Sequence, residues 1–111
     1  MQSKTIETIN SEQFIDRIIL RKADALVKVS SPWNGASQML CQTLQGLAST
    51  YAGKVNFFAL DSESESSLGT TYRVDVIPTI LFFKKGTLVD RLSGLTHRTT
   101  ISHKILQLIN S

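Results

Sequence analysis

The feature that most constrains the fold is the alternation of short apolar runs with longer segments of helical period. Each short run suits a strand, because it is rich in apolar side chains and is bounded by polar residues or glycine. The expected strands are residues 4–9, 25–30, 55–60, 79–83 and 88–92. With the helical segments between and after them, the order is β-α-β-α-β-α-β-β-α. This order predicts an α/β fold in which a mixed central sheet is flanked by four helices.

The helices are predicted from apolar side chains that recur on one face. The longest pattern runs from residue 35 or 36 to residue 52. Its apolar positions are Leu40, Leu44, Leu47 and Tyr51. Asn10, with Gln13 three residues later, is expected to cap a helix whose buried face carries Phe14, Ile15, Ile18 and Ile19. Leu68 and Tyr72 can anchor a short helix, and Thr99 or Thr100 is the expected N-cap of the last one.

Length and composition limit the class of protein. The chain has 111 residues, which favours one domain over residues 1–111, and 41% of its residues are hydrophobic. No apolar stretch approaches the roughly 18 residues that a membrane helix needs. Residues 1–10 also lack the apolar core of a signal peptide. We therefore expect a cytoplasmic protein without a membrane partner.

Charge and metal-ligating residues exclude further classes. The net charge is +3, and only two pairs of adjacent basic residues occur, Arg21-Lys22 and Lys84-Lys85. A nucleic-acid surface would need a denser basic stripe, so no nucleic-acid partner is expected. Cys41 is the single cysteine, which excludes an intrachain disulfide and a zinc site built from thiols. His97 and His103 are six residues apart, whereas a helical metal pair needs a spacing of three or four, so neither a metal nor a cofactor is expected.

The junction between the second expected strand and the long helix is the best candidate for a functional site. The segment 30–37 reads Ser-Ser-Pro-Trp-Asn-Gly-Ala-Ser. Pro32 stops the strand, and the turn that follows lies at the edge of the sheet. Free N–H groups and the helix dipole at such a helix start favour anionic groups.

This junction resembles the active-site motif of the thioredoxin family. Residues 33–37, Trp-Asn-Gly-Ala-Ser, are similar to Trp-Cys-Gly-Pro-Cys with both thiols replaced. Residues 72–86 are similar to the family segment in which a hydrophobic residue precedes a cis-proline, followed by Thr, an apolar strand and a Lys-x-Gly turn. The resemblance continues to Gly94 and the last helix. It covers nearly all of residues 5–110 and implies the thioredoxin fold.

The same resemblance argues against the family's disulfide exchange. In the family the first cysteine attacks and the second resolves the mixed disulfide, whereas this chain has Asn34 and Ser37 at those positions. A buried aspartate that assists proton transfer in the family corresponds to Lys28, and its frequent lysine partner corresponds to Ala59. Both thiols and the proton relay are therefore missing, and no residue is expected to be catalytic.

A binding role does not require thiols. The resemblance implies a cis Ile77–Pro78 bond opposite the Trp33 turn, with the backbone before the proline pairing with an extended segment of a partner protein. The expected partner-binding groove consists of Trp33, Asn34, Gly35, Val76, Ile77, Pro78 and Gly94. The leading interpretation is a redox-inactive, thioredoxin-like protein that is a monomer or weak dimer and holds a polypeptide there.

Three alternatives remain open. Cys41 lies on the same helical face as Ser37, and as a free thiol it could make the chain a thiol-disulfide oxidoreductase of cell redox homeostasis; the competing interpretation is a small apolar residue packed under the sheet. Lys28 could be a buried nucleophile, or its stem could cover apolar surface while the ammonium reaches water. A structural subunit could also dock through a helix face or through strand 88–92.

Overall fold

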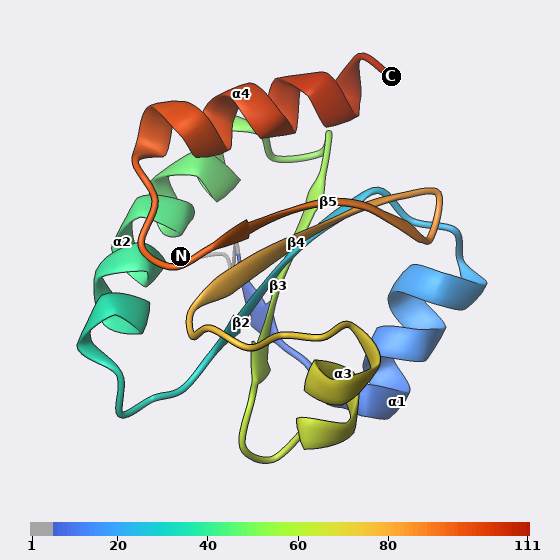
Figure 1. Ribbon diagram of the computed structural model, residues 1–111. Coiled ribbons are helices and arrows are strands. Elements are labelled where there is room, and N and C mark those ends of the chain that lie inside the picture. Colours follow the sequence, from blue (N-terminus) through green and yellow to red (C-terminus); the bar gives the residue numbers. More distant parts are fainter. Residues whose placement is uncertain (1–5) are drawn as a thin grey trace, which may run out of the picture.

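The computed structural model describes residues 6–111 and has the predicted order of elements (Figure 1). Along the chain these are β1 (Glu7–Thr8), α1 (Ser11–Phe14), η1 (Ile15–Leu20), β2 (Ala25–Ser30), α2 (Gly35–Thr50), β3 (Asn56–Asp61), α3 (Ser66–Thr71), β4 (Thr79–Lys84), β5 (Thr87–Ser93) and α4 (Arg98–Ile109). Positions 4 and 5 of the predicted first strand lie outside the described residues. The predicted α/β class with a mixed sheet is confirmed.

The sheet has five strands in the order β1-β3-β2-β4-β5. β1 and β2 both run parallel to β3, while β4 is antiparallel to β2 and β5 is antiparallel to β4. β2 is therefore the central strand, and five of its six residues are buried. Its burial explains why its sequence is almost entirely apolar.

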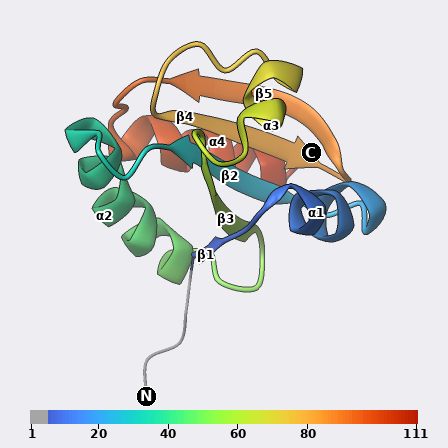
Figure 2. The same ribbon diagram turned by 90° about the horizontal axis from the view of Figure 1, so that it is seen from below.

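Helices cover both faces of the sheet. α2 and α4 lie on one face, and α1 and α3 lie on the other, as Figures 1 and 2 both show. Side chains alternate between the two faces along each strand. On the α2 side the core includes Leu26, Phe57, Ile80 and Phe82 with Leu44 and Ile105, and on the α1 side it includes Val27, Phe58, Leu81 and Phe83 with Phe14 and Ile18.

The first helix differs from its prediction in one respect. Asn10 caps it as expected, because its side-chain oxygen accepts from the Gln13 backbone N–H at 2.8 Å. The Gln13 side-chain oxygen in turn accepts from the Asn10 backbone N–H. After Phe14, however, the helix continues as the π-helical segment η1. Its wider turns do not follow the 3.6-residue period, so Phe14 and Ile18 are buried while Ile15 is 48% exposed.

The last helix begins earlier than predicted. Its N-cap is His97, not Thr99 or Thr100, and the His97 carbonyl accepts from the Ile101 N–H at 3.2 Å. No side chain caps this helix start. The helix is held by packing, because its buried face, with Ile101, Ile105 and Leu108, lies against the sheet.

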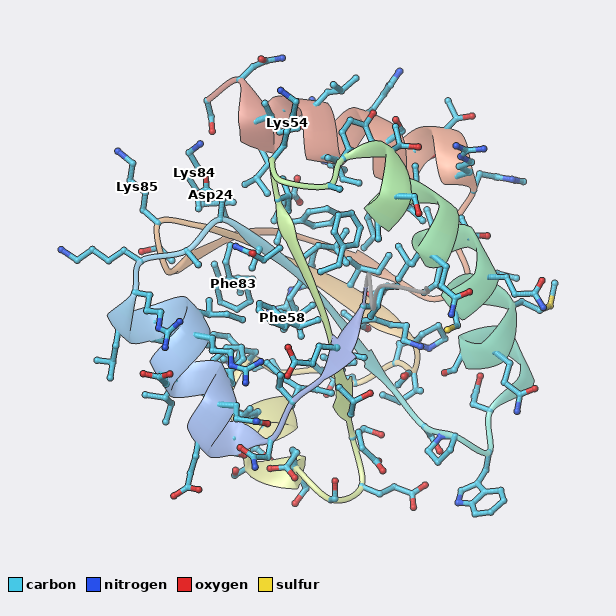
Figure 3. All side chains as sticks on the ribbon, turned by 180° about the vertical axis from the view of Figure 1, so that it is seen from behind. Asp24, Lys54, Phe58, Phe83, Lys84 and Lys85 are labelled. Atoms are coloured by element: carbon cyan, nitrogen blue, oxygen red, sulfur yellow. The ribbon has the colours of Figure 1, made fainter. Side chains whose placement is uncertain are left out.

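Asp24 fixes the end of the sheet at which β2 begins (Figure 3). Its carboxylate lies 3.2 Å from the Lys84 ammonium and accepts from the Lys85 backbone N–H at 2.9 Å. Lys84 also donates to the Leu108 carbonyl at 3.0 Å. These bonds join β2, the turn between β4 and β5, and the end of α4. In the part of the chain described, no helix is long and apolar enough to cross a membrane.

Candidate functional site

Strand register brings three distant segments to one end of the sheet. Val29 in β2 pairs with Thr79 in β4, and Thr79 pairs with Ser93 in β5. The β2–α2 loop, the segment before β4 and the loop after β5 therefore leave the sheet at the same end (Figure 1). The Gly94 N–H donates to the Pro78 carbonyl at 2.7 Å and joins two of these segments directly.

The β2–α2 loop presents Trp33 to solvent. The Trp33 side chain is 84% exposed, although its backbone is held by the Ser31 hydroxyl, which accepts from the Trp33 N–H at 3.3 Å. Gln38 holds the same loop from α2 by donating to the Pro32 carbonyl at 3.1 Å. Ser31 and Gln38 thus hold the loop from both sides. The exposed Trp33 indole does not take part in core packing.

Asn34 and Ser37, which stand at the family's cysteine positions, are both part of the start of α2. Asn34 is the N-cap, and its Oδ1 accepts from the Ser37 backbone N–H at 2.9 Å. The Ser37 side chain is 2% exposed, and its hydroxyl has no hydrogen-bond partner among the residues described. Neither side chain can form or break a disulfide.

The segment before β4 contains a cis peptide bond between Ile77 and Pro78. Pro78 is buried, Ile77 is half-buried, and Val76 is 47% exposed. The Val76 carbonyl accepts from the Thr79 hydroxyl at 2.6 Å. Within residues 6–111, the backbone N–H and C=O of Ile77 make no hydrogen bond.

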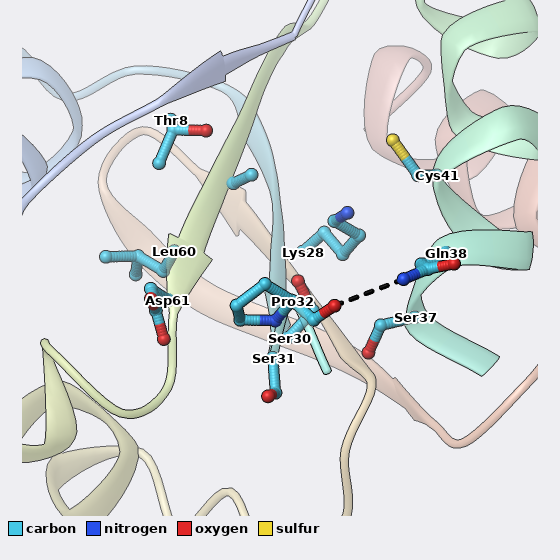
Figure 4. Close-up of a pocket in the computed structure, with 11 residues that line it drawn as sticks. Thr8, Lys28, Ser30, Ser31, Pro32, Ser37, Gln38, Cys41, Leu60 and Asp61 are labelled. Carbon is cyan, nitrogen blue, oxygen red and sulfur yellow. Dashed lines mark hydrogen bonds between the residues drawn. The ribbon is translucent and has the colours of Figure 1, made fainter. Parts of the chain in front are cut away.

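Lys28 and Ala59, which the resemblance places at the positions of the family's aspartate and lysine, are register partners on β2 and β3. They line a pocket of about 260 Å³ between these strands and α2 (Figure 4). Ser37 and Cys41 also line it, so both do share the side of α2 that faces the pocket. Cys41 is half-buried there, and its sulfur accepts a weak bond from the Gln45 amide at 3.8 Å.

The pocket was not predicted from the sequence. The signal that could have found it is Lys28, a single charged residue within the apolar run of β2. Elsewhere in the chain, His97 and His103 are both exposed, and no group of three or more potential metal ligands occurs among residues 6–111.

Comparison with known proteins decides the family. The Thioredoxin family model matches residues 5–107. The chain belongs to the thioredoxin family. The resemblance seen in the two sequence motifs is thereby confirmed, and so is the thioredoxin fold.

Plant and cyanobacterial thioredoxins are among its relatives. The chain is 30% identical over 104 residues to the chloroplastic M-type thioredoxin of Pisum sativum. The aligned region covers 94% of this chain and 60% of the pea protein. It is 25% identical over 97 residues to thioredoxin 1 of a Nostoc strain, covering 87% of this chain and 91% of that protein. The chain thus spans less than two thirds of the length of the pea relative.

A solved structure supports the same fold. The structure of chloroplastic thioredoxin z superimposes with a TM-score of 0.85 and 22% sequence identity, and covers 100% of both chains. Since Cys41 is the single cysteine of this thioredoxin-like chain, its composition is compatible with a redox-inactive form.

Proposed function

We propose that this chain is a redox-inactive member of the thioredoxin family that binds an extended segment of a partner polypeptide beside Trp33 and the cis-proline Pro78. The observation that carries this proposal is the backbone of Ile77. Its N–H and C=O make no hydrogen bond within residues 6–111, and they lie at the same end of the sheet as the exposed Trp33. An extended segment can pair with such a backbone as a strand pairs with the edge of a sheet.

The side chains around Ile77 supply the apolar contacts that this recognition needs. Trp33 is 84% exposed and Val76 is 47% exposed. Large aromatic side chains of this kind supply much of the binding energy of protein interfaces. The amide nitrogen of Asn34 adds donors, because the cap of α2 uses only its oxygen. Gly35 and Gly94 complete the proposed groove, and a side chain at Gly94, with φ +81°, would be strained.

Disulfide exchange is not part of this proposal. It requires a thiolate that attacks and a second thiol that resolves the mixed disulfide. Asn34 and Ser37 occupy the two positions, and Cys41 lies in the second turn of α2, on the pocket beside Lys28 and not in the Trp33 loop. Binding is therefore expected to be independent of reductant.

Affinity capture with the immobilised chain tests the proposal. Wild type is compared with Trp33→Ala, which removes an exposed side chain and should leave the fold intact, and with Ile77→Asp, which places a charge in the groove. A partner retained by wild type in the presence of reductant should bind each variant at least about tenfold more weakly, as expected when an interface hot spot is removed. Leu106→Asp is the matched control, because Leu106 is 42% exposed on α4.

Thermal unfolding of each variant separates loss of binding from loss of the fold. Equal affinity of folded wild type, Trp33→Ala and Ile77→Asp would exclude the groove as the binding site. A partner that reductant releases from wild type, and that Cys41→Ser no longer captures, would instead favour the thiol-dependent alternative.

A further inference from the structure

The pocket between β2, β3 and α2 is lined by Lys28, whose ammonium has no protein partner among residues 6–111. Figure 4 shows the Lys28 side chain crossing the pocket, with Thr8 and Leu60 on one side and Gln38 and Cys41 on the other. Lys28 is 7% exposed. No hydrogen bond or ion pair involves its ammonium anywhere in residues 6–111. An ammonium has three donors, and with no protein acceptor these donors are left to water or to a bound anion in the pocket.

A second unsatisfied donor lines the same pocket. The Ser37 hydroxyl is fully buried and has no partner among the described residues, and buried polar groups in native proteins rarely lack one. Ser37 also lies in the first turn of the 16-residue helix α2, where the dipole favours negative charge. The ammonium, the hydroxyl and the helix start therefore all favour an anion at this place.

The other walls limit the kind of anion. Pro32, Ala59 and Leu60 give the pocket apolar surface, and Asp61 adds a carboxylate that forms no ion pair with Lys28. The pocket thus carries one cation, Lys28, and one carboxylate, Asp61. A dianion is disfavoured there, because its second negative charge would be repelled by the Asp61 carboxylate in a partly desolvated site. The pocket volume of about 260 Å³ is slightly below the volume of pockets that hold drug-sized ligands, so the anion has to be small.

We propose that this pocket binds a small monocarboxylate, with the Lys28 ammonium and the Ser37 hydroxyl as donors and the apolar walls around its short hydrocarbon part. The ligand class combines one negative charge, two acceptor oxygens and a small apolar body. This site does not rest on the proposed partner groove, because none of Trp33, Ile77 and Pro78 lines it.

Titration of the ¹⁵N-labelled chain with sodium butyrate tests the proposal. Ionic strength is held constant with sodium chloride, and backbone amide shifts are followed. The amides of Ser31, Gln38 and Cys41 should shift along saturable curves that give one common Kd. Inorganic phosphate, titrated in the same way, should bind more weakly than butyrate.

Two variants test separately whether the Lys28 ammonium and the Ser37 hydroxyl donate to the bound carboxylate. Lys28→Met keeps the length of the side chain and should weaken butyrate binding at least about tenfold, because it removes a charged donor. Ser37→Ala should weaken it by about two- to tenfold, as expected for one neutral hydrogen bond. Lys85→Met removes the same charge at an exposed position outside the pocket and should leave the Kd unchanged.

Three results would overturn the proposal. They are shifts at the pocket amides that do not saturate, an unchanged Kd in folded Lys28→Met, and phosphate binding that is tighter than butyrate binding. Because no partner polypeptide is present in this titration, its outcome is independent of the capture experiment.

Discussion

Asn34 shows at the scale of single residues how a position that has lost its chemistry gains a structural role. The family has its attacking cysteine here, whereas Asn34 caps α2 by accepting from the Ser37 N–H at 2.9 Å. Asparagine is among the best N-cap residues, because its short side chain reaches the free N–H groups of the first turn. The replacement is therefore compatible with the fold and incompatible with disulfide exchange.

We predict that Asn34→Ala lowers the free energy of unfolding by about 1 kcal/mol, within the usual 0.5–2 kcal/mol for a lost N-cap. Asn34→Asp should keep the stability, because a carboxylate accepts the same bond and also interacts favourably with the helix dipole. Urea unfolding of wild type and both variants measures the difference. An Asn34→Ala protein as stable as wild type would show that the cap adds nothing to the fold.

At the scale of elements, the turn between β4 and β5 depends on a glycine that meets another element. Gly86 has φ +82°, and a Cβ there would lie 3.0 Å from the backbone oxygens of both Ile18 and Ile19 at the end of η1. Its N–H donates to the Ala23 carbonyl at 2.9 Å. The hairpin turn is thus packed directly against the first helical segment, where only a glycine fits.

We predict that Gly86→Ala lowers the free energy of unfolding by at least about 2 kcal/mol, since left-handed backbone strain of about 1–2 kcal/mol adds to the backbone clash. Gly53→Ala is the matched control for strain alone, because Gly53 has φ +81° with open space around it. Gly46→Ala, inside α2 with no neighbour within 4 Å, should instead stabilise the protein by about 1 kcal/mol. Thermal and urea unfolding of the three variants would contradict this account if Gly86→Ala and Gly53→Ala were equally mild.

At the scale of the whole molecule, the missing thiols and the missing proton relay belong to different elements. Asn34 and Ser37 begin α2, whereas Lys28 lies in β2 beside Ala59 in β3. The sheet and α2 hold these positions together around one pocket, with both Lys28 and Ser37 on its walls. Restoring the family's disulfide exchange at this site would therefore require changes at both places.

We predict that the double variant Asn34→Cys, Ser37→Cys forms an intramolecular disulfide but reduces insulin slowly. Adding Lys28→Asp should raise the rate by about tenfold or more, because the family's carboxylate assists proton transfer, a role that typically contributes 10²–10⁴-fold in enzymes. Thiol counting under denaturing conditions checks the disulfide, with Cys41 as the single remaining free thiol, and insulin turbidity measures the rate. Equal rates of the double and triple variants would show that Lys28 does not limit the chemistry.

Local pattern determined a large part of this protein. The bounds of β2 were predicted without error, and α2 was predicted within two residues at its end, because strand composition and helical period are properties of neighbouring residues. The capping box of Asn10 and Gln13 was likewise readable from spacing. The absence of thiols at positions 34 and 37 needs no structure at all. Ile15 was misplaced, since the π-helical turns of η1 break the period on which its prediction depended.

The family resemblance already indicated the residues of the partner-binding groove, but tertiary structure alone showed how the segments of both candidate sites meet. Val29, Thr79 and Ser93 are far apart in sequence, and only the strand register places the Trp33 loop, Ile77 and Gly94 at one end of the sheet. Within residues 6–111, the Ile77 backbone and the Lys28 ammonium have no hydrogen-bond partner, and this also depends on which groups distant segments leave free. Sequence patterns report which face a residue occupies, whereas hydrogen-bond partners and pockets are set by the docking of whole elements.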